Sequence, residues 1–208
     1  MFEFRRFLES SEAVIAYHGT RNQFDRLEPR PARYGTGISF TKSKEIASMY
    51  GEGQFKGGKR DGSVRIIKAE ITGNLFDFTA PINKSKLANG VRTFLEKYKD
   101  DFTPEKYQMI LRQMIGSSDG ESFWRGLLRS FSKRGTDREC QMAKSKNIDR
   151  SSCESVIESR YMPDVINDVL RSVGYSGITY MDTNAGITHR CYLVFDTDNV
   201  NELDSRLA

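Results

Sequence analysis

The spacing of hydrophobic residues divides the chain into strand-like ends and a helical middle. Near the start, the apolar run at residues 13–17 and the glycine-led segment 35–41 are typical of short strands. Residues 64–71 alternate between apolar and polar side chains, as in a strand with one buried face. This part of the chain is therefore predicted to be mainly β-structure.

Helical spacing first appears after residue 41. Apolar residues at 46, 47, 49 and 50 fall on one face of a helix, and Thr41 or Ser43 is its predicted N-cap. The following segment, 51–62, contains five glycines and mixed charges, which is typical of a loop.

From residue 84 the helical period continues over a long stretch. Segments 87–98, 104–115 and 123–131 are predicted helices, and together they form a helical insertion at about 84–159. Near the C-terminus we expect a helix at 163–173, a turn at 174–177 and strands at 178–181 and 191–195. The chain is therefore predicted to be a single domain over residues 1–208, of the α+β class.

The composition is that of an ordinary globular protein. Of the 208 residues, 38% are hydrophobic and 29% are charged, and no apolar run approaches the roughly 20 residues of a membrane-spanning helix. Residues 1–8 lack the apolar stretch of a secretory signal. Three cysteines without a Cys-x-x-Cys pair favour reduced thiols, and two histidines argue against a structural zinc site. We therefore expect a cytoplasmic protein with no membrane segment and no structural metal.

Positive charge is concentrated in the segment 125–150, called the basic block below. It holds eight Lys or Arg residues against three Asp or Glu residues, a surplus of +5 in a chain whose net charge is +4. Such a run is most simply a solvated helix face. The alternative is a surface that contacts nucleic-acid phosphates, with Phe123 and Trp124 available for base stacking.

Candidate chemistry begins where the first predicted strand ends, at His18, Gly19 and Thr20. An imidazole stands there beside a residue without a side chain, so that a flat ligand can approach the main chain closely. A histidine–glycine pair alone is more typical of a turn than of a binding site. A second segment changes this interpretation.

The segment from Gly35 to Tyr50 resembles a run found in poly-ADP-ribose polymerases and related toxins. That run reads Gly, any residue, Gly, Ile, Tyr, Phe and a small residue, followed after a helical turn or two by a small residue and, three positions later, a tyrosine; the spacing agrees without a gap. In that family the histidine binds a ribose hydroxyl of NAD, the glycine backbone holds the nicotinamide amide, and the tyrosine stacks on the nicotinamide ring. The resemblance implies these roles for His18, Gly19 and Tyr50. The NAD-binding set that it implies is His18, Gly19, Thr20, Ser39, Phe40 and Tyr50.

Ser39 departs from the family pattern, because most members have a tyrosine at that position. The resemblance then implies that this wall of the pocket is supplied by another group or left open. The structural alternative is that Phe40 and Tyr50 are core aromatic residues and that Ser39 is a cap.

The C-terminal segments 174–182 and 191–196 resemble the end of phage and prophage ADP-ribosyltransferase domains, including small anti-CRISPR transferases. Many members carry a glutamate just before the last strand, where this chain has Cys191. The resemblance implies Asp182, at the end of the preceding strand, as the acid, with His189 and Asp196 as second choices. Two alternatives stay open: residues 182–184 form a polar hairpin turn, or Cys191 and His189 form a thiol nucleophile with its base.

The resemblance therefore implies an NAD-dependent mono-ADP-ribosyltransferase with an ADP-ribosyltransferase-like split β-sandwich. NAD would be the substrate, Asp182 and His18 the catalytic residues, and a macromolecule, first of all a protein, the acceptor of ADP-ribose. A carboxylate suits the reaction, because cleavage of the nicotinamide–ribose bond builds positive charge on the ribose. Such a protein would act as a phage or bacterial effector in the cytoplasm.

Two other functions stay open. The missing glutamate and Ser39 are also consistent with a catalytically silent NAD-binding or interaction module. The basic block at 125–150 would suit a nucleic-acid-binding or nucleic-acid-modifying protein. The sequence indicates neither the acceptor nor the oligomeric state.

Overall fold

The structure is a computed structural model, and it describes residues 13–21, 27–32, 34–53, 63–97, 108, 111–112, 116–126, 162–184 and 186–207. Strands and helices both occur, in the order β1 (Val14–Thr20), β2 (Arg30–Ala32), β3 (Gly35–Thr41), α1 (Lys44–Glu52), β4 (Arg65–Ile71), β5 (Leu75–Asp77), α2 (Lys84–Lys97), α6 (Met162–Ser172), β6 (Gly177–Asn184), β7 (Ile187–Val194), the short 3-10 helix η3 (Thr197–Asn199) and β8 (Val200–Leu207). Residues 120–126 are also helical. The predicted α+β class is confirmed.

The strands form one connected sheet in the order β5-β6-β7-β3-β1-β4-β8, with β2 paired to β3. Strand β1 pairs with β4 along its whole length, but with β3 through the single residue pair Tyr17 and Thr41. The split β-sandwich that the resemblance implies consists of two packed sheets, whereas here the strands are joined in one path at a narrow joint. One half of the sheet contains β1, β4 and β8, and the other contains β2, β3, β5, β6 and β7.

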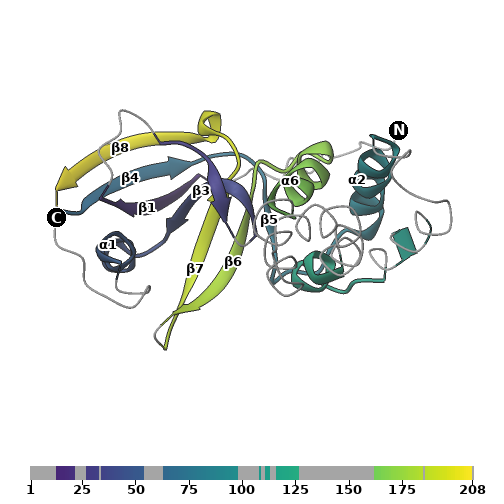
Figure 1. Cartoon of the computed structure of the whole chain (residues 1–208), viewed down its shortest axis with the longest axis horizontal. Helices are drawn as coiled ribbons and strands as arrows, with labels where there is room; N and C mark the ends of the chain where they lie inside the picture. Colours follow the sequence, from purple (N-terminus) through teal and green to yellow (C-terminus); the bar gives the residue numbers. More distant parts are fainter. Residues whose placement is uncertain are drawn as a thin grey trace, which may run out of the picture.

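Two main cores hold the sheet and the helices together. The first lies where α2, α6 and the helical residues 120–126 cover strands β5 to β7, and Phe123, Ile166 and Phe195 are fully buried in it. The second collects apolar side chains from β1 and β4 of one half and from β3 and β7 of the other. The molecule is elongated, with α2 and α6 at one end and α1 beside β1 at the other (Figure 1).

Helix α1 begins where the capping pattern predicts. The hydroxyl of Ser43 accepts a hydrogen bond from the backbone N–H of Ile46 at 3.1 Å, so Ser43 is the N-cap. Ile46 and Ala47 are buried, and the helix packs on β1 and β4. This packing places Tyr50, in the last turns of α1, near the C-terminal end of β1.

The β6–β7 hairpin is longer than the apolar pattern predicts. Asp182 lies inside β6 and is paired with His189 of β7, so the interpretation of residues 182–184 as a turn is wrong. The apolar alternation stops early because the outer part of this hairpin carries polar side chains on the face that meets Tyr50.

The helical insertion is described in part. Helix α2 and the helical residues 120–126 agree with the predicted helices at 87–98 and 123–131. Most of the predicted helix at 104–115, and residues 127–161 with most of the basic block, lie outside the described residues. In the part of the chain that the structure describes, no helix has both the length and the apolar character needed to cross a membrane.

Candidate functional site

A cavity of about 370 Å³ opens beside the narrow joint of the sheet, between β1, β3 and the end of α1. Its volume is within the range of small-molecule sites. Five residues of the predicted NAD set line it: His18, Gly19, Thr20, Ser39 and Tyr50. Three segments that are separate in the sequence therefore meet at one cavity.

Phe40, the sixth member of the set, does not line the cavity. Its side chain is only 2% exposed and belongs to the core shared by the two halves of the sheet. The ring meets the His18 imidazole edge-on, with 5.8 Å between the ring centroids. Phe40 is therefore a core residue that packs against His18, which agrees with the structural alternative stated for it above.

The imidazole of His18 is held in one orientation. Its Nδ1 lies 2.7 Å from the carbonyl oxygen of Ser39, which can only accept, so Nδ1 carries the proton. Burial lowers the pKa of His18, and Arg30 lowers it further, against the opposing effect of the Ser39 hydrogen bond. The ring is therefore neutral near pH 7, and its Nε2 is available as an acceptor for a ligand hydroxyl.

The glycines of the two motifs are explained by packing. A side chain on Gly19 would collide with the carbonyl oxygen of Ala47 in α1, and one on Gly37 would collide with the backbone of Val194 in β7. Gly35 lies against the amide of Asn167, which hydrogen-bonds Thr36 through both its oxygen and its nitrogen. These glycines allow close approach of protein to protein, so their presence alone does not require a ligand.

Tyr50 connects the cavity to the β6–β7 hairpin. The ring lines the cavity and is 36% exposed, whereas its hydroxyl donates to Asp182 Oδ2 at 2.9 Å. His189 Nε2 lies 3.0 Å from the same hydroxyl, and Asn184 donates to its oxygen at 2.8 Å. Burial raises the pKa of Tyr50, as do Cys191 and Asp182 nearby, so the phenol stays protonated. The aromatic ring is therefore fixed by four polar neighbours on the hairpin.

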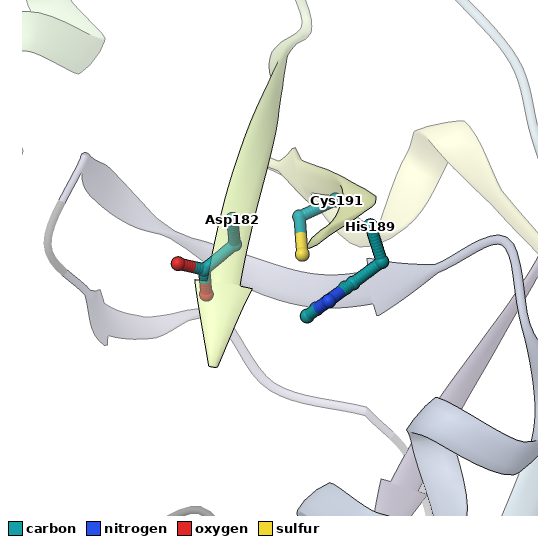
Figure 2. A group of neighbouring side chains, drawn as sticks. All are labelled: Asp182, His189 and Cys191. Atoms are coloured by element: carbon teal, nitrogen blue, oxygen red, sulfur yellow. The ribbon is translucent and has the colours of Figure 1, made fainter. Parts of the chain in front are cut away.

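Asp182 reaches the cavity only through Tyr50, because it is not among the lining residues. Its Oδ2 accepts from Tyr50 and from Asn184 at 2.7 Å, and its Oδ1 accepts from the backbone N–H of Thr183 at 3.0 Å. Figure 2 shows the carboxylate beside the side chains of His189 and Cys191 on the same hairpin. Of the two second choices, His189 belongs to this group and Asp196 does not, because Asp196 forms an ion pair with Arg171 at 2.8 Å.

Cys191 is poorly suited to be a nucleophile. Its side chain is 4% exposed. Burial raises the pKa of the thiol to about 12 and the nearby Asp182 also raises it, whereas the hydroxyls of Tyr180 and Tyr50 beside the sulfur lower it. Near neutral pH the sulfur is therefore a protonated thiol, and the thiolate is the reactive form. The thiol-nucleophile alternative finds no support in this geometry.

Sequence reasoning missed charged residues at the cavity. Arg21, Glu28 and Arg30 line it together with the predicted residues. Arg21 donates from Nε to the Gly51 carbonyl and from Nη2 to the Glu52 carbonyl, at 2.8 and 2.9 Å, and so holds the C-terminal end of α1. Arg21 directly follows the His-Gly-Thr segment, so its position was a usable signal. Arg30 lies outside both motifs, between Thr20 and Gly35, and no pattern in the sequence indicates it.

The two aromatic residues proposed to stack on nucleic-acid bases are buried. Phe123 is 0% exposed and Trp124 is 8% exposed, so neither is available for stacking on a base, and that prediction is wrong. Both side chains belong to the core under α2 and α6. Within the described part of the basic block, Arg125 forms an ion pair with Glu121 at 2.6 Å.

Comparisons with known proteins add little to this geometry. No protein-family model matches the chain, and no curated protein matches its sequence. Among solved structures, the chain is similar to one described as the crystal structure of an anti-CRISPR protein, with 12% identity and a TM-score of 0.39, over 93% of this chain and 98% of that one. A likeness at this level carries no argument about function.

Proposed function

We propose that this protein is an NAD-dependent mono-ADP-ribosyltransferase that transfers ADP-ribose to a macromolecular acceptor. The observation that carries the proposal is the meeting of His18, Ser39 and Tyr50 at one cavity, with the Tyr50 hydroxyl bonded to Asp182. The sequence motifs alone predict these residues as members of one site. An ADP-ribosyltransferase-like split β-sandwich belongs to the same proposal, supported by two half-sheets that share a core and join at one residue pair.

In this proposal the nicotinamide lies against the ring of Tyr50, whose orientation the hairpin fixes. The Nε2 atom of His18 accepts a hydrogen bond from a ribose hydroxyl, because its Nδ1 proton is already donated to Ser39. Arg21 and Arg30 at the cavity supply positive charge suited to the diphosphate. The acceptor is first of all a protein, and mass spectrometry of a cell lysate incubated with labelled NAD would identify it.

Asp182 is the proposed acid. As nicotinamide leaves, positive charge grows on the ribose, and a nearby carboxylate stabilises that charge. The hydrogen bonds from Tyr50 and Asn184 hold the carboxylate next to the ring that would bind nicotinamide. His18 contributes by orienting the ribose, not by transferring protons.

A second candidate is a catalytically silent NAD-binding module. It is favoured by the environment of Asp182, whose two oxygens already accept three hydrogen bonds and which does not line the cavity. The two functions share NAD binding and differ in turnover. Release of nicotinamide by the wild-type protein, with a lysate as the source of acceptors, separates them.

Replacing Tyr50 by alanine tests the binding mode directly. We expect Tyr50→Ala to lose about 1–3 kcal/mol of NAD binding free energy, because the stacking surface is removed. Tyr50→Phe is the matched control: it keeps the ring and removes the hydroxyl that bonds Asp182, so its NAD affinity should stay near that of the wild type. Calorimetry on the folded variants measures both. Equal affinity of wild type and Tyr50→Ala contradicts the assignment.

Replacing His18 tests the ribose contact. His18→Ala should weaken NAD binding by roughly 0.5–1.5 kcal/mol, the usual contribution of one hydrogen bond, and should lower turnover. His18→Gln should keep part of both, because the amide can donate to Ser39 and accept from a hydroxyl. Circular dichroism first checks folding, since His18 also links β1 to β3. Full activity of a folded His18→Ala protein would remove His18 from the proposed site.

A further inference from the structure

Three side chains with different donor atoms converge on the β6–β7 hairpin. Asp182 and His189 are cross-strand partners, and Cys191 is two residues beyond His189 on β7, so all three lie on one face of the hairpin. One carboxylate oxygen, one imidazole nitrogen and the sulfur lie within 4.8 Å of one another. Figure 2 shows the three side chains next to each other, with the sulfur between the carboxylate and the imidazole in this view.

The donor set has the chemistry of a transition-metal site. Sulfur, imidazole nitrogen and carboxylate oxygen are the ligands that Zn²⁺ uses, and three protein ligands with a fourth open position are typical of its catalytic and exchangeable sites. Ca²⁺ and Mg²⁺ prefer oxygen ligands and do not suit a cysteine–histidine pair. A mixed site needs only one histidine, so the low histidine count does not exclude it.

Neighbouring groups already orient the ligands. His189 Nδ1 lies 3.2 Å from the carbonyl oxygen of Ile187, which can only accept, so in a metal-bound form the ring proton would be on Nδ1 and the Nε2 lone pair would face the ion. The backbone N–H of Thr183 and the amide of Asn184 hold the carboxylate of Asp182. Metal sites commonly have such supporting contacts around their ligands.

The Tyr50 hydroxyl occupies the point toward which the three ligands turn. It lies 2.9 Å from Asp182 Oδ2 and 3.0 Å from His189 Nε2, and it is also beside the sulfur of Cys191. We propose that Asp182, His189 and Cys191 bind one divalent ion of the zinc class, which takes the place of the Tyr50 hydroxyl. The thiol loses its proton on binding, and solvent completes the coordination.

This site goes beyond the proposed transferase function, because the transfer reaction uses neither Cys191 nor a metal. Asp182 belongs to the metal site and to the transferase site, so a bound metal would coordinate its carboxylate and break the hydrogen bond from Tyr50. The test therefore uses the metal alone, without NAD, and its result does not depend on whether NAD binds.

The experiment is a titration of the reduced, full-length protein with Zn²⁺ by calorimetry, and with Co²⁺ by absorption spectroscopy. We expect one equivalent of each metal and a sulfur-to-cobalt charge-transfer band. Cys191→Ser should lower the affinity by more than the 10–100-fold typical of a lost supporting contact, and should abolish the band. The matched control is Cys140→Ser/Cys153→Ser, which removes the other two thiols and should bind like the wild type. Mg²⁺ should not compete.

Thermal unfolding completes the test, because a bound metal stabilises only the folded protein that holds it. Zn²⁺ should raise the Tm of the wild type and of the control variant, and leave that of Cys191→Ser unchanged. Metal-free melting shows that Cys191→Ser is folded. The proposal is overturned if the wild type binds no stoichiometric metal, or if Cys191→Ser binds as tightly as the wild type.

Discussion

Asp182→Asn should lower the rate of ADP-ribose transfer on the order of 100-fold or more, while NAD affinity changes little. The substitution keeps the size of the side chain and removes the negative charge, so a contact that matters mainly in the transition state is lost. The structure adds a detail: Asp182 Oδ2 accepts from both Tyr50 and Asn184. The amide oxygen must take that position, and its NH₂ group then faces the Thr183 N–H, so one hydrogen bond is lost.

Nicotinamide release measures the rate, and calorimetry measures NAD affinity. Asp196→Asn is the matched control, because Asp196 pairs with Arg171 away from the cavity and its loss should leave the rate unchanged. Wild-type turnover by Asp182→Asn would transfer the role to His189, which contacts the same tyrosine. If the wild type releases no nicotinamide with any acceptor, the silent module is the correct function.

Gly19→Ala should lower the free energy of unfolding by about 3 kcal/mol, or roughly 6–12 °C in Tm, the upper range for overpacking. The added methyl group would collide with the carbonyl oxygen of Ala47, and it would lie only 3.2 Å from the backbone nitrogen of Gly51. Both neighbours are backbone atoms of α1, so they cannot turn aside as a side chain could. Helix α1 must move away from β1, and Tyr50 would move with it.

Gly174→Ala is the matched control for the glycine substitution. Gly174 has a φ of 83°, and an added methyl group there would meet open space, so only backbone strain of about 1–2 kcal/mol is expected. Urea or thermal unfolding measures the free energy of unfolding of both variants, and so compares the effect of a steric collision with that of backbone strain. A Gly19→Ala protein as stable as the wild type would contradict the packing explanation and return Gly19 to a role in ligand binding alone.

Local patterns predicted the elements whose sequences are strongly periodic. Strands β1, β3 and β4 and helices α1, α2 and α6 lie where hydrophobic spacing placed them. Strand β8 was missed because it is an edge strand of largely polar residues, with Leu203 47% exposed. Strands β2 and β5 have three residues each, too few to show a period.

Motif spacing predicted which residues share the cavity, but not how they contact one another. The bond between Tyr50 and Asp182 joins residues 132 positions apart, and it depends on how far the polar hairpin extends. Phe40 and the glycines belong to the same motifs, yet their environments are explained by packing. A motif contains residues that bind a ligand and residues that are needed for packing, and the structure is required to distinguish them.

The narrow joint of the sheet has a consequence for how the two halves of the sheet are held together. Where β1 and β3 separate, the cross-strand link near the cavity is carried by the His18 side chain on Ser39, in addition to the single backbone pair of Tyr17 and Thr41. Away from this line, the core shared by the two halves and the hydrogen bond from Tyr50 to Asp182 hold them together. A molecule bound in the cavity would contact both halves, so we expect it to increase the protection of backbone amides from hydrogen exchange in each of them.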